Sequence, residues 1–457
     1  MAILGPTFEE MLHPATIAPE IRRRAREMKT ADPLNPVNLF NINWRDRSSD
    51  ICHFVMPQEL TGVDANIVVL YGKEFPTGSH KVGSAYAVLL EEELLEGLDP
   101  GVHTLVWPST GNFGIGGAYI GGLKGYRSIV VLPEGMSRER FDVIESYGAQ
   151  IKKTPGSEAN VKEIYDETNR LRRNRDARIM NQFALMGNYR FHYHVTGNTI
   201  AELARALEER GVGDGTISAF CAAMGSAGTM AAGDRLKQLW PELKIVGLEP
   251  VQCPTLYNNG YGSHDIQGIG DKHVTWIHNV LNQDAIMCLD DTECKQGLQL
   301  LTDEAGWNVL VKSLGIAPAQ VEKMAAIFGI SGVCNVLGAI KTAKFYGMGA
   351  RDTIVTICTD NVARYRSVMA ELTQRYGTMD ETEAAVRTRI FRGQRTDWIR
   401  EGDTEARQQW HNLKYYTWVE QQGKSVEELD AQRDPAWWLK HQQMVGEIDA
   451  RLLAARA

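Results

Sequence analysis

The chain has 457 residues, of which 43% are hydrophobic and 23% charged, as in folded globular proteins large enough to form two domains. Its net charge of −8 excludes the basic surface that nucleic-acid binding requires, and no run approaches the ~20 apolar residues of a membrane span. We therefore expect a cytoplasmic protein that acts on small molecules, without a nucleic-acid or membrane partner. The 7 scattered cysteines form no metal-type pair, so we expect reduced core thiols and no metal site.

Residues 1–60 read as an N-terminal arm, with a basic helix over 21–29 followed by a Pro- and Asn-rich segment. We expect this arm to pack on the body of the protein or on a second subunit. From residue 67 onward, short β-branched runs alternate with helical runs, which predicts parallel sheets covered on both faces and hence an α/β fold. The expected strands are 67–71, 104–107, 128–132, 150–154, 178–182, 217–222, 245–248 and 353–358, and the expected helices include 84–95, 161–173, 199–210, 230–239 and 320–346.

Beyond residue 376 the sequence becomes densely charged and contains five tryptophans. We expect amphipathic helices anchored by aromatic side chains here, without strands. Such a helical extension, residues 376–457, is consistent with packing on the parent domain, with oligomerisation or with covering the mouth of an active site.

Lys81 lies in the loop 76–81 (PTGSHK), between an apolar strand and a helix. The N-H groups of a helix N-terminus repel an ammonium and attract an anion, so a lysine there is easier to deprotonate and lies close to a natural phosphate site. This placement favours a Schiff base between Lys81 and pyridoxal phosphate. The alternative is an ordinary surface lysine.

A first glycine-containing loop follows the strand 104–107 and includes Ser109, Thr110, Gly111, Asn112 and Phe113. Main-chain N-H groups and hydroxyls at a helix start suit a carboxylate. The amide of Asn112 suits a phenolate-like oxygen. The alternative is a tight turn that requires glycine for conformational reasons.

A second loop of small residues follows the strand 217–222. Between a strand and a helix, such residues form a nest of N-H groups for a phosphate monoester, which two hydroxyls supplement. The loop has neither the lysine of a nucleotide P-loop nor the spacing of a dinucleotide fingerprint, which favours a cofactor phosphate. Its residues are Gly225, Ser226, Ala227, Gly228 and Thr229.

Together with the segments 192–197, 264–270, 329–332 and 359–365, these loops resemble, in order, those of the fold type II pyridoxal-phosphate enzymes. The resemblance covers roughly residues 62–367 and is strongest to the cysteine synthase and cystathionine β-synthase group. It implies two open parallel-sheet domains like those of the tryptophan synthase β-subunit. The large cofactor-binding domain would comprise 61–83 and 190–375, and the small mobile domain 84–189.

The resemblance also implies roles for individual residues. Lys81 would hold the cofactor as an internal aldimine and act as general base, while Ser331 would meet the pyridine nitrogen. The cofactor would also contact Asn112 and the loop from Gly225 to Thr229. The substrate would contact Ser109, Thr110, Gly111, Asn112, Phe113, Gln182, Gln267 and Gly268.

A neutral hydroxyl at Ser331 favours β-elimination or β-replacement over transamination. The implied activity is thus cysteine synthase-like chemistry on a β-substituted L-amino acid through an aminoacrylate, in a homodimer. Three departures from the synthases are Phe113 after the asparagine, Val82-Gly83 after the lysine and His80 before it. They disfavour O-acetylserine as substrate. For His80 we favour a structural role, and residues 257–263 are a candidate substrate lid.

Two alternatives remain open. A β-eliminating ammonia-lyase, dehydratase or desulfhydrase would release a keto acid and ammonia without an added nucleophile. A cofactor-retaining regulatory subunit would bind pyridoxal phosphate without turnover. A nicotinamide dehydrogenase is disfavoured, because the spacing in residues 111–116 (GNFGIG) does not supply the dinucleotide fingerprint.

Overall fold

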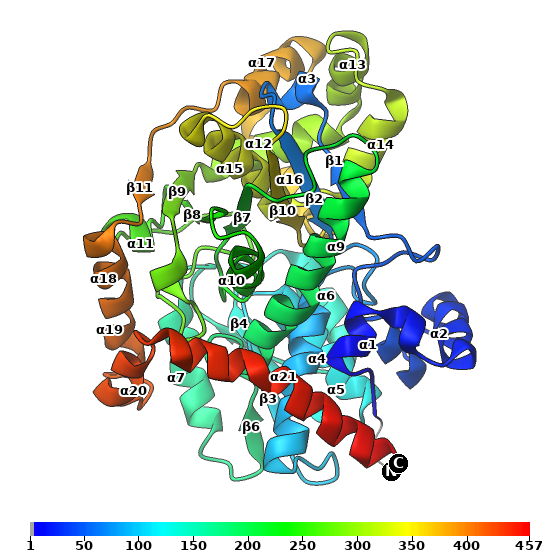
Figure 1. The fold of residues 1–457 in the computed structure, drawn as a ribbon, viewed down its shortest axis with the longest axis vertical. Helices are drawn as coiled ribbons and strands as arrows, with labels where there is room; N and C mark the ends of the chain where they lie inside the picture. The colour runs from blue at the N-terminus through cyan, green and yellow to red at the C-terminus, as the bar shows by residue number, and fades with distance from the viewer. Residues whose placement is uncertain (1–3) are drawn as a thin grey trace.

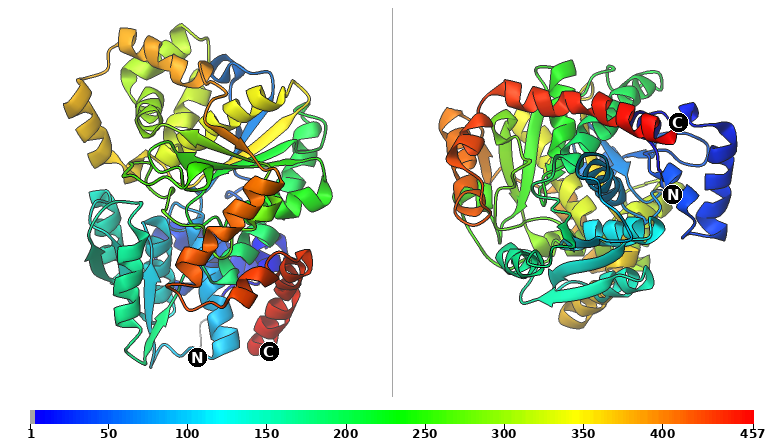
Figure 2. Two further views of the ribbon diagram at one scale, coloured as in Figure 1. Left: turned by 90° about the vertical axis from the view of Figure 1, so that its left-hand side faces the viewer. Right: turned by 90° about the horizontal axis from the view of Figure 1, so that it is seen from below.

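The computed structural model describes residues 4–457, so the first three residues of the predicted N-terminal arm lie outside the described part. The strands form two separate sheets, which lie in two lobes (Figures 1 and 2). The larger sheet has the order β1-β2-β10-β7-β8-β9-β11 and the smaller one the order β5-β4-β3-β6.

In the larger sheet the five central strands run parallel, and the edge strands β1 and β11 pair antiparallel with their neighbours. Every residue of the central strands β7, β9 and β10 is buried, as expected for parallel strands covered by helices on both faces. The strands are β1 (His53–Val55), β2 (Asn66–Tyr71), β7 (Ala219–Ala223), β8 (Lys244–Pro250), β9 (Ala285–Leu289), β10 (Thr353–Cys358) and β11 (Ile399–Glu401).

The smaller sheet is parallel throughout. All four of its strands come from the stretch between α4 and α8. They are β3 (Thr104–Pro108), β4 (Arg127–Pro133), β5 (Gln150–Thr154) and β6 (Ala177–Ile179).

Helices follow most strands and cover the sheets. The longest of the body is α15, whose N-terminal fourteen residues are buried in the core of the larger sheet. The helices of the body are α4 (Lys81–Glu96), α5 (Asn112–Leu123), α6 (Arg138–Ser146), α7 (Val161–Leu171), α8 (Met186–Arg190), a π-helical turn η3 (Phe191–Thr196), α9 (Gly197–Glu208), α10 (Met230–Leu239), α11 (Thr255–Asn258), α12 (Asp291–Thr302), α13 (Glu304–Lys312), α14 (Pro318–Ile327), α15 (Ile330–Tyr346) and α16 (Arg366–Tyr376), with short turns η4 (Val280–Asn282) and η5 (Val362–Arg364).

The described parts of the N-terminal and C-terminal segments pack on the body and on each other (Figures 1 and 2). Asp449 accepts hydrogen bonds from the backbone N-H groups of Phe8 and Glu9, and Arg456 forms an ion pair of 2.7 Å with Glu10. The N-terminal helices are α1 (Phe8–Leu12), η1 (Pro14–Thr16), α2 (Pro19–Ala31), η2 (Pro36–Asn41) and α3 (Gln58–Thr61), and the C-terminal ones are α17 (Glu381–Arg392), α18 (Thr404–Asn412), α19 (Lys414–Trp418), α20 (Val426–Ala431) and α21 (Pro435–Arg456).

The predicted α/β class, with parallel sheets and a helical C-terminal region, is confirmed. Three strands were not predicted. Two of them, β1 and β11, are three-residue edge strands with no apolar run, and β9 is a short buried strand without alternation. The expectation that no strand follows residue 376 is wrong, because β11 pairs with β9. The expected helix 320–346 is two helices that meet at Phe328 and Gly329.

Within residues 4–457, no single helix is long and apolar enough to cross a membrane. Only the pair α14 and α15, bent by 119°, has that length and composition when taken together, and both helices contribute to the core beside the larger sheet.

The tryptophans of the C-terminal extension predict a measurable dependence of stability on this region. Trp410 is fully buried and its indole N-H donates to the carbonyl oxygen of Leu256 at 2.9 Å. Trp410→Ala should lower the free energy of unfolding by about 3 kcal/mol or more, because it leaves a cavity and removes one of the two hydrogen bonds to that carbonyl, the other coming from Arg400. Urea unfolding measures this effect. Tyr416→Ala, at a side chain that is 58% exposed, is the control and should leave the midpoint almost unchanged.

Candidate active site

One pocket collects residues that follow the carboxyl ends of parallel strands from both sheets. Lys81 follows β2, Ser226 follows β7, and the loop from Ser109 to Phe113 follows β3. Parallel strands end at the same edge of a sheet, so loops distant in sequence converge there. The residues that line the pocket are Lys81, Ser109, Thr110, Gly111, Asn112, Phe113, Gln182, Ser226, Gly268, Ser331 and Thr359.

Lys81 is the first residue of α4, and its Nζ donates to Ser226 Oγ at 2.9 Å. Burial lowers the pKa of the Lys81 amine to about 8, against the opposing influence of the carboxylates of Asp271 and Glu158. The sequence predicted easier deprotonation from the helix N-terminus. In the structure, loss of hydration is the main cause.

The turn from Gly225 to Thr229 leads from β7 into α10 beside Lys81. It has no room for side chains at its glycines. A Cβ at Gly225 would lie 2.8 Å from the carbonyl oxygen of Gly268, and one at Gly228 would lie 2.3 Å from Asn188 Oδ1. The backbone of Ala227 is left-handed, with φ at 57°. Of this turn, only Ser226 lines the pocket itself, while Gly225, Ala227, Gly228 and Thr229 adjoin it.

Asn188, on α8, joins this turn to the rest of the pocket. Its Nδ2 donates to Ser226 Oγ at 3.0 Å and to the carbonyl oxygen of Gln182 at 2.9 Å. Its Oδ1 is buried without a hydrogen-bond partner among the residues described. The sequence analysis did not identify Asn188, because a lone asparagine in a short helix carries no pattern.

In the loop that follows β3, Ser109 Oγ accepts hydrogen bonds from the backbone N-H groups of Gly111 and Gly114, at 2.9 and 2.8 Å. Two of the amides expected to be free for a ligand are therefore used to shape the loop. Phe113 is buried and packs edge-on against Trp107, with ring centroids 5.6 Å apart.

Asp360, just after β10, organises a buried polar network next to this loop. It accepts hydrogen bonds from Asn112 Nδ2 at 2.6 Å and from the Tyr365 hydroxyl at 2.9 Å, and it pairs with Arg140 at 3.8 Å. Asn112 thus donates one of its two amide hydrogens to Asp360, while its Oδ1 has no hydrogen-bond partner within residues 4–457. The basic character of residues 138–140 in the sequence gave no sign that Arg140 would be fully buried here.

Gln267 does not line the pocket. Its Oε1 accepts hydrogen bonds from the guanidinium of Arg140 and from the backbone N-H of Ser137, and its Nε2 donates to Asp265 at 3.0 Å. The next residue, Gly268, does line the pocket, with φ at 101°. The structure therefore separates the two neighbours that the sequence analysis grouped as substrate contacts.

Two carboxylates near Lys81 were also missed. Burial raises the pKa of Asp271 to about 7, although Lys81 favours its charged form. Burial likewise raises the pKa of Glu158 well above its usual value, and the charge of Asp271 adds to this effect. Both residues lie in irregular loops, where an acidic residue is normally a solvated one.

His80 lies behind the pocket. Its ring is fully buried, stacks on Trp44 at 5.5 Å and meets His192 edge-on at 5.1 Å. Burial lowers its pKa well below the usual value, and Lys81 adds to this shift. A neutral, packed imidazole agrees with the structural role that the sequence analysis favoured.

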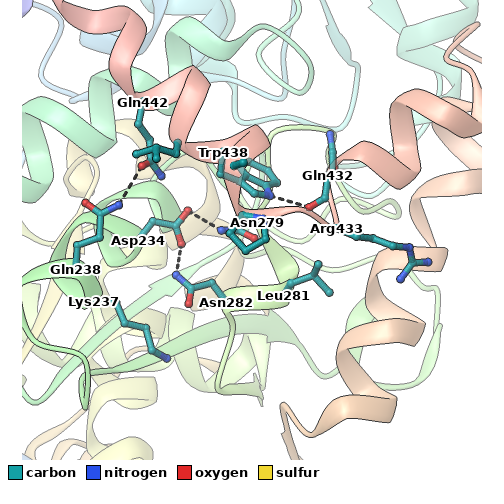
Figure 3. Close-up of a pocket in the computed structure, with 13 residues that line it drawn as sticks. Asp234, Lys237, Gln238, Asn279, Leu281, Asn282, Gln432, Arg433, Trp438 and Gln442 are labelled. Atoms are coloured by element: carbon teal, nitrogen blue, oxygen red, sulfur yellow. Dashed lines mark hydrogen bonds between the residues drawn. The ribbon is translucent and has the colours of Figure 1, made fainter.

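A second pocket lies between α10 and α21 (Figure 3). There Asp234 accepts hydrogen bonds from Tyr189, Asn279 and Asn282, and Gln238 donates to Gln442 at 3.0 Å. These polar groups hydrogen-bond to one another, and the amine of Lys237, which also lines the pocket, pairs with Asp284 at 2.5 Å. It joins the C-terminal extension to α10, whereas the reactive groups gather around Lys81.

Comparison with known proteins places this geometry in context. Residues 62–360 match the model of a family described as pyridoxal-phosphate dependent enzyme. A cysteine synthase of Staphylococcus aureus is 32% identical over 310 residues, which are 67% of this chain and 90% of the relative. Cysteine synthase 3 of Caenorhabditis elegans is 29% identical over 287 residues, 62% of this chain and 76% of the relative.

Solved structures share the fold. The crystal structure of a cysteine synthase from Entamoeba histolytica has a TM-score of 0.60 at 23% identity and covers 75% of this chain and 93% of its own. That of a hydrogen sulfide-producing enzyme from Fusobacterium nucleatum has a TM-score of 0.57 at 24% identity, with coverage of 68% and 95%.

The geometry of Gly111 yields a test of the loop. Its φ is 151°, and a Cβ there would lie 2.5 Å from Nε of the buried Arg140. Gly111→Ala should lower the free energy of unfolding by about 2 kcal/mol or more, because the side chain strains the backbone and overpacks the site. Gly446→Ala is the control, since nothing lies within 4 Å of its Cβ position in α21. Equal urea midpoints for the two variants would contradict the described packing.

Proposed function

Because the chain belongs to the pyridoxal-phosphate-dependent enzymes, in the cysteine synthase family, we propose that it catalyses β-replacement or β-elimination on a β-substituted L-amino acid. The observation that carries the proposal is the partly desolvated amine of Lys81, which lines one pocket with Ser226 of the predicted phosphate turn and with the predicted carboxylate loop.

The residues present fit the cofactor. The turn from Gly225 to Thr229 is a cradle that side chains would fill, and its amides and hydroxyls suit a phosphate monoester. Ser331, at the start of α15, faces the same pocket as Lys81 and suits the pyridine nitrogen. Asn112 retains one amide hydrogen for the ring oxygen.

When bound, pyridoxal phosphate supplies the electron sink that weakens the bonds at the α-carbon and β-carbon of an amino acid. Lys81 then carries the proton chemistry. With a pKa of about 8, its amine has a substantial neutral fraction near neutral pH and can accept the α-proton as a general base.

The loop from Ser109 to Phe113 binds the substrate carboxylate in this proposal. Its shape is fixed by the hydrogen bonds that Ser109 Oγ accepts, which reduces the entropy cost of ordering it. Gln182 and Gly268 complete the substrate wall. Gln267 acts indirectly, through Arg140.

We further propose that the small domain, residues 84–189, closes over the substrate against the large domain, residues 61–83 and 190–375. Contacts between α6 and the segment after β10 support this view. Ser137 Oγ donates to the carbonyl oxygen of Arg364 at 2.8 Å, and Glu139 accepts from the backbone N-H of Ser367 at 2.8 Å.

We also propose a cytoplasmic location and a homodimer. The dimer is supported by α21, where the apolar side chains of Leu439 and Leu453 are 48% and 52% exposed. Light scattering on the purified protein measures the assembly state. A monomeric mass would overturn this part.

Assay of the purified protein with serine, cysteine, threonine and O-acetylserine, each with and without sulfide, tests the reaction. A new amino acid that forms only with sulfide identifies replacement, whereas a keto acid and ammonia formed without it identify elimination. Binding of pyridoxal phosphate without turnover of any substrate would instead support the regulatory subunit.

Replacing the lysine tests the site directly. Lys81→Ala should abolish the visible absorption of lysine-bound pyridoxal phosphate and lower turnover by about a thousandfold or more, since both the covalent link and the base are lost. Lys344→Ala is the control. Burial lowers the pKa of Lys344 too, but its Nζ bonds the carbonyl oxygens of Arg392 and Gln394 instead. Retained lysine-type absorption in Lys81→Ala would disprove the assignment.

The lowered pKa of Lys81 predicts a pH dependence. Only the neutral amine attacks the cofactor aldehyde, so binding of pyridoxal phosphate by cofactor-free protein should accelerate as pH rises and level off above about 8. An ordinary lysine amine would level off near 10.5. Stopped-flow absorption from pH 6 to 10 measures the profile. A midpoint close to the ordinary value would contradict the effect of burial.

A further inference from the structure

Glu158 and Asp271 are buried acids that no basic side chain hydrogen-bonds within residues 4–457. Glu158 is fully buried and Asp271 is 5% exposed. Neither carboxylate has a cationic hydrogen-bond partner within residues 4–457, and the Thr110 hydroxyl and the Gly268 N-H are neutral donors close to Glu158. Burying an unpaired carboxylate is costly, so these two acids resist ionisation until a cation comes within reach of them.

Glu158 lies between two hollows of the molecule. Its neighbour Ser157 lines a cleft where α6 faces α16. The carboxylate of Glu158 is close to the Thr110 hydroxyl and the Gly268 N-H, and both of these residues line the Lys81 pocket. It therefore occupies the wall between the cleft and the pocket.

Asp271 approaches from the side of the phosphate turn. A Cβ built on Gly225 would lie 3.5 Å from Asp271 Oδ2, and the charge of Lys81 acts on this carboxylate. The same Cβ position on Gly225 would lie 2.8 Å from the carbonyl oxygen of Gly268, whose N-H is close to Glu158, so the two acids approach one region beside the lysine.

The cations nearby are already engaged. The guanidinium of Arg140 donates to Gln267 and Tyr365 and pairs with Asp360. The amine of Lys81 donates to Ser226 and, in the proposed function, binds the cofactor. Neither hydrogen-bonds to Glu158 or Asp271.

We propose that Glu158 and Asp271 form a subsite for an ammonium group carried by the β-substituent of the amino-acid substrate. This inference rests on the proposed function and specifies its substrate class. An ammonium has three N-H donors and a positive charge, which matches two buried carboxylates that lack a cationic hydrogen-bond partner.

The charges that line the cleft also favour a substrate with a cationic β-substituent. Five acids and two basic residues, Arg138 and Lys153, line it, so it attracts cations. The acids are Glu134, Asp142, Glu145, Asp265 and Glu371.

Two pairs of probes of nearly equal shape test the inference on the enzyme loaded with pyridoxal phosphate. L-2,3-diaminopropionate is compared with L-2-aminobutyrate, and S-(2-aminoethyl)-L-cysteine with S-propyl-L-cysteine. Each pair differs by an ammonium in place of a methyl. Titration followed by the change in cofactor absorption gives the Kd. At least one cationic probe should bind about tenfold or more tightly than its neutral partner.

Variants locate the preference. Glu158→Gln and Asp271→Asn should each lower the ratio of the Kd of the neutral probe to the Kd of the cationic probe by about tenfold. Glu167→Gln is the control, because that side chain pairs with Arg170 on the surface of α7. It should leave the preference intact.

The outcomes separate the two proposals. If the wild-type enzyme binds or converts neutral amino acids but shows no preference for either cationic probe, the subsite is disproved and the proposed function stands. If no amino acid changes the cofactor absorption, the proposed function itself fails. The wild-type comparison remains decisive even where a variant does not fold.

Discussion

The chemistry of this site depends on the loss of hydration at one amine, that of Lys81. Lys81 loses hydration at the base of α4, and that loss moves its pKa into the range where it can act both as nucleophile and as base. Two parallel sheets make this possible, because the loops after β2, β3, β7 and β10 meet at their carboxyl ends and exclude water around it. The acids beside Lys81 moderate the effect without removing it.

The sequence carried much of this arrangement. Local signals were sufficient for the alternating strands and helices, for Lys81 and for the loops around Asn112 and Ser226, because each lies in a contiguous pattern of small, hydroxyl and apolar residues. Ten of the residues expected at the site line the same pocket as a result.

The contacts that could not be predicted from the sequence join residues that are far apart in the chain. Arg140, Asp360 and Asn188 owe their importance to partners far away in the chain, such as Asn112 for Asp360. The carboxylates of Glu158 and Asp271 differ from ordinary loop acids only in being buried. Burial of a loop acid depends on how the two lobes meet. Gln267 shows the reverse case. It belongs to a recognisable segment, yet its side chain turns toward Arg140.

The C-terminal helix α21 has a further consequence. Arg190 of α8 pairs with Glu91 of α4 and donates to the carbonyl oxygen of His441 in α21 at 3.2 Å. The helix that starts with Lys81 and the helix that carries Asn188 are therefore both held in place by contacts to α21. Because α21 covers this buried ion pair, a change that displaced α21 would expose the pair to water and loosen the two helices that position Lys81 and Asn188.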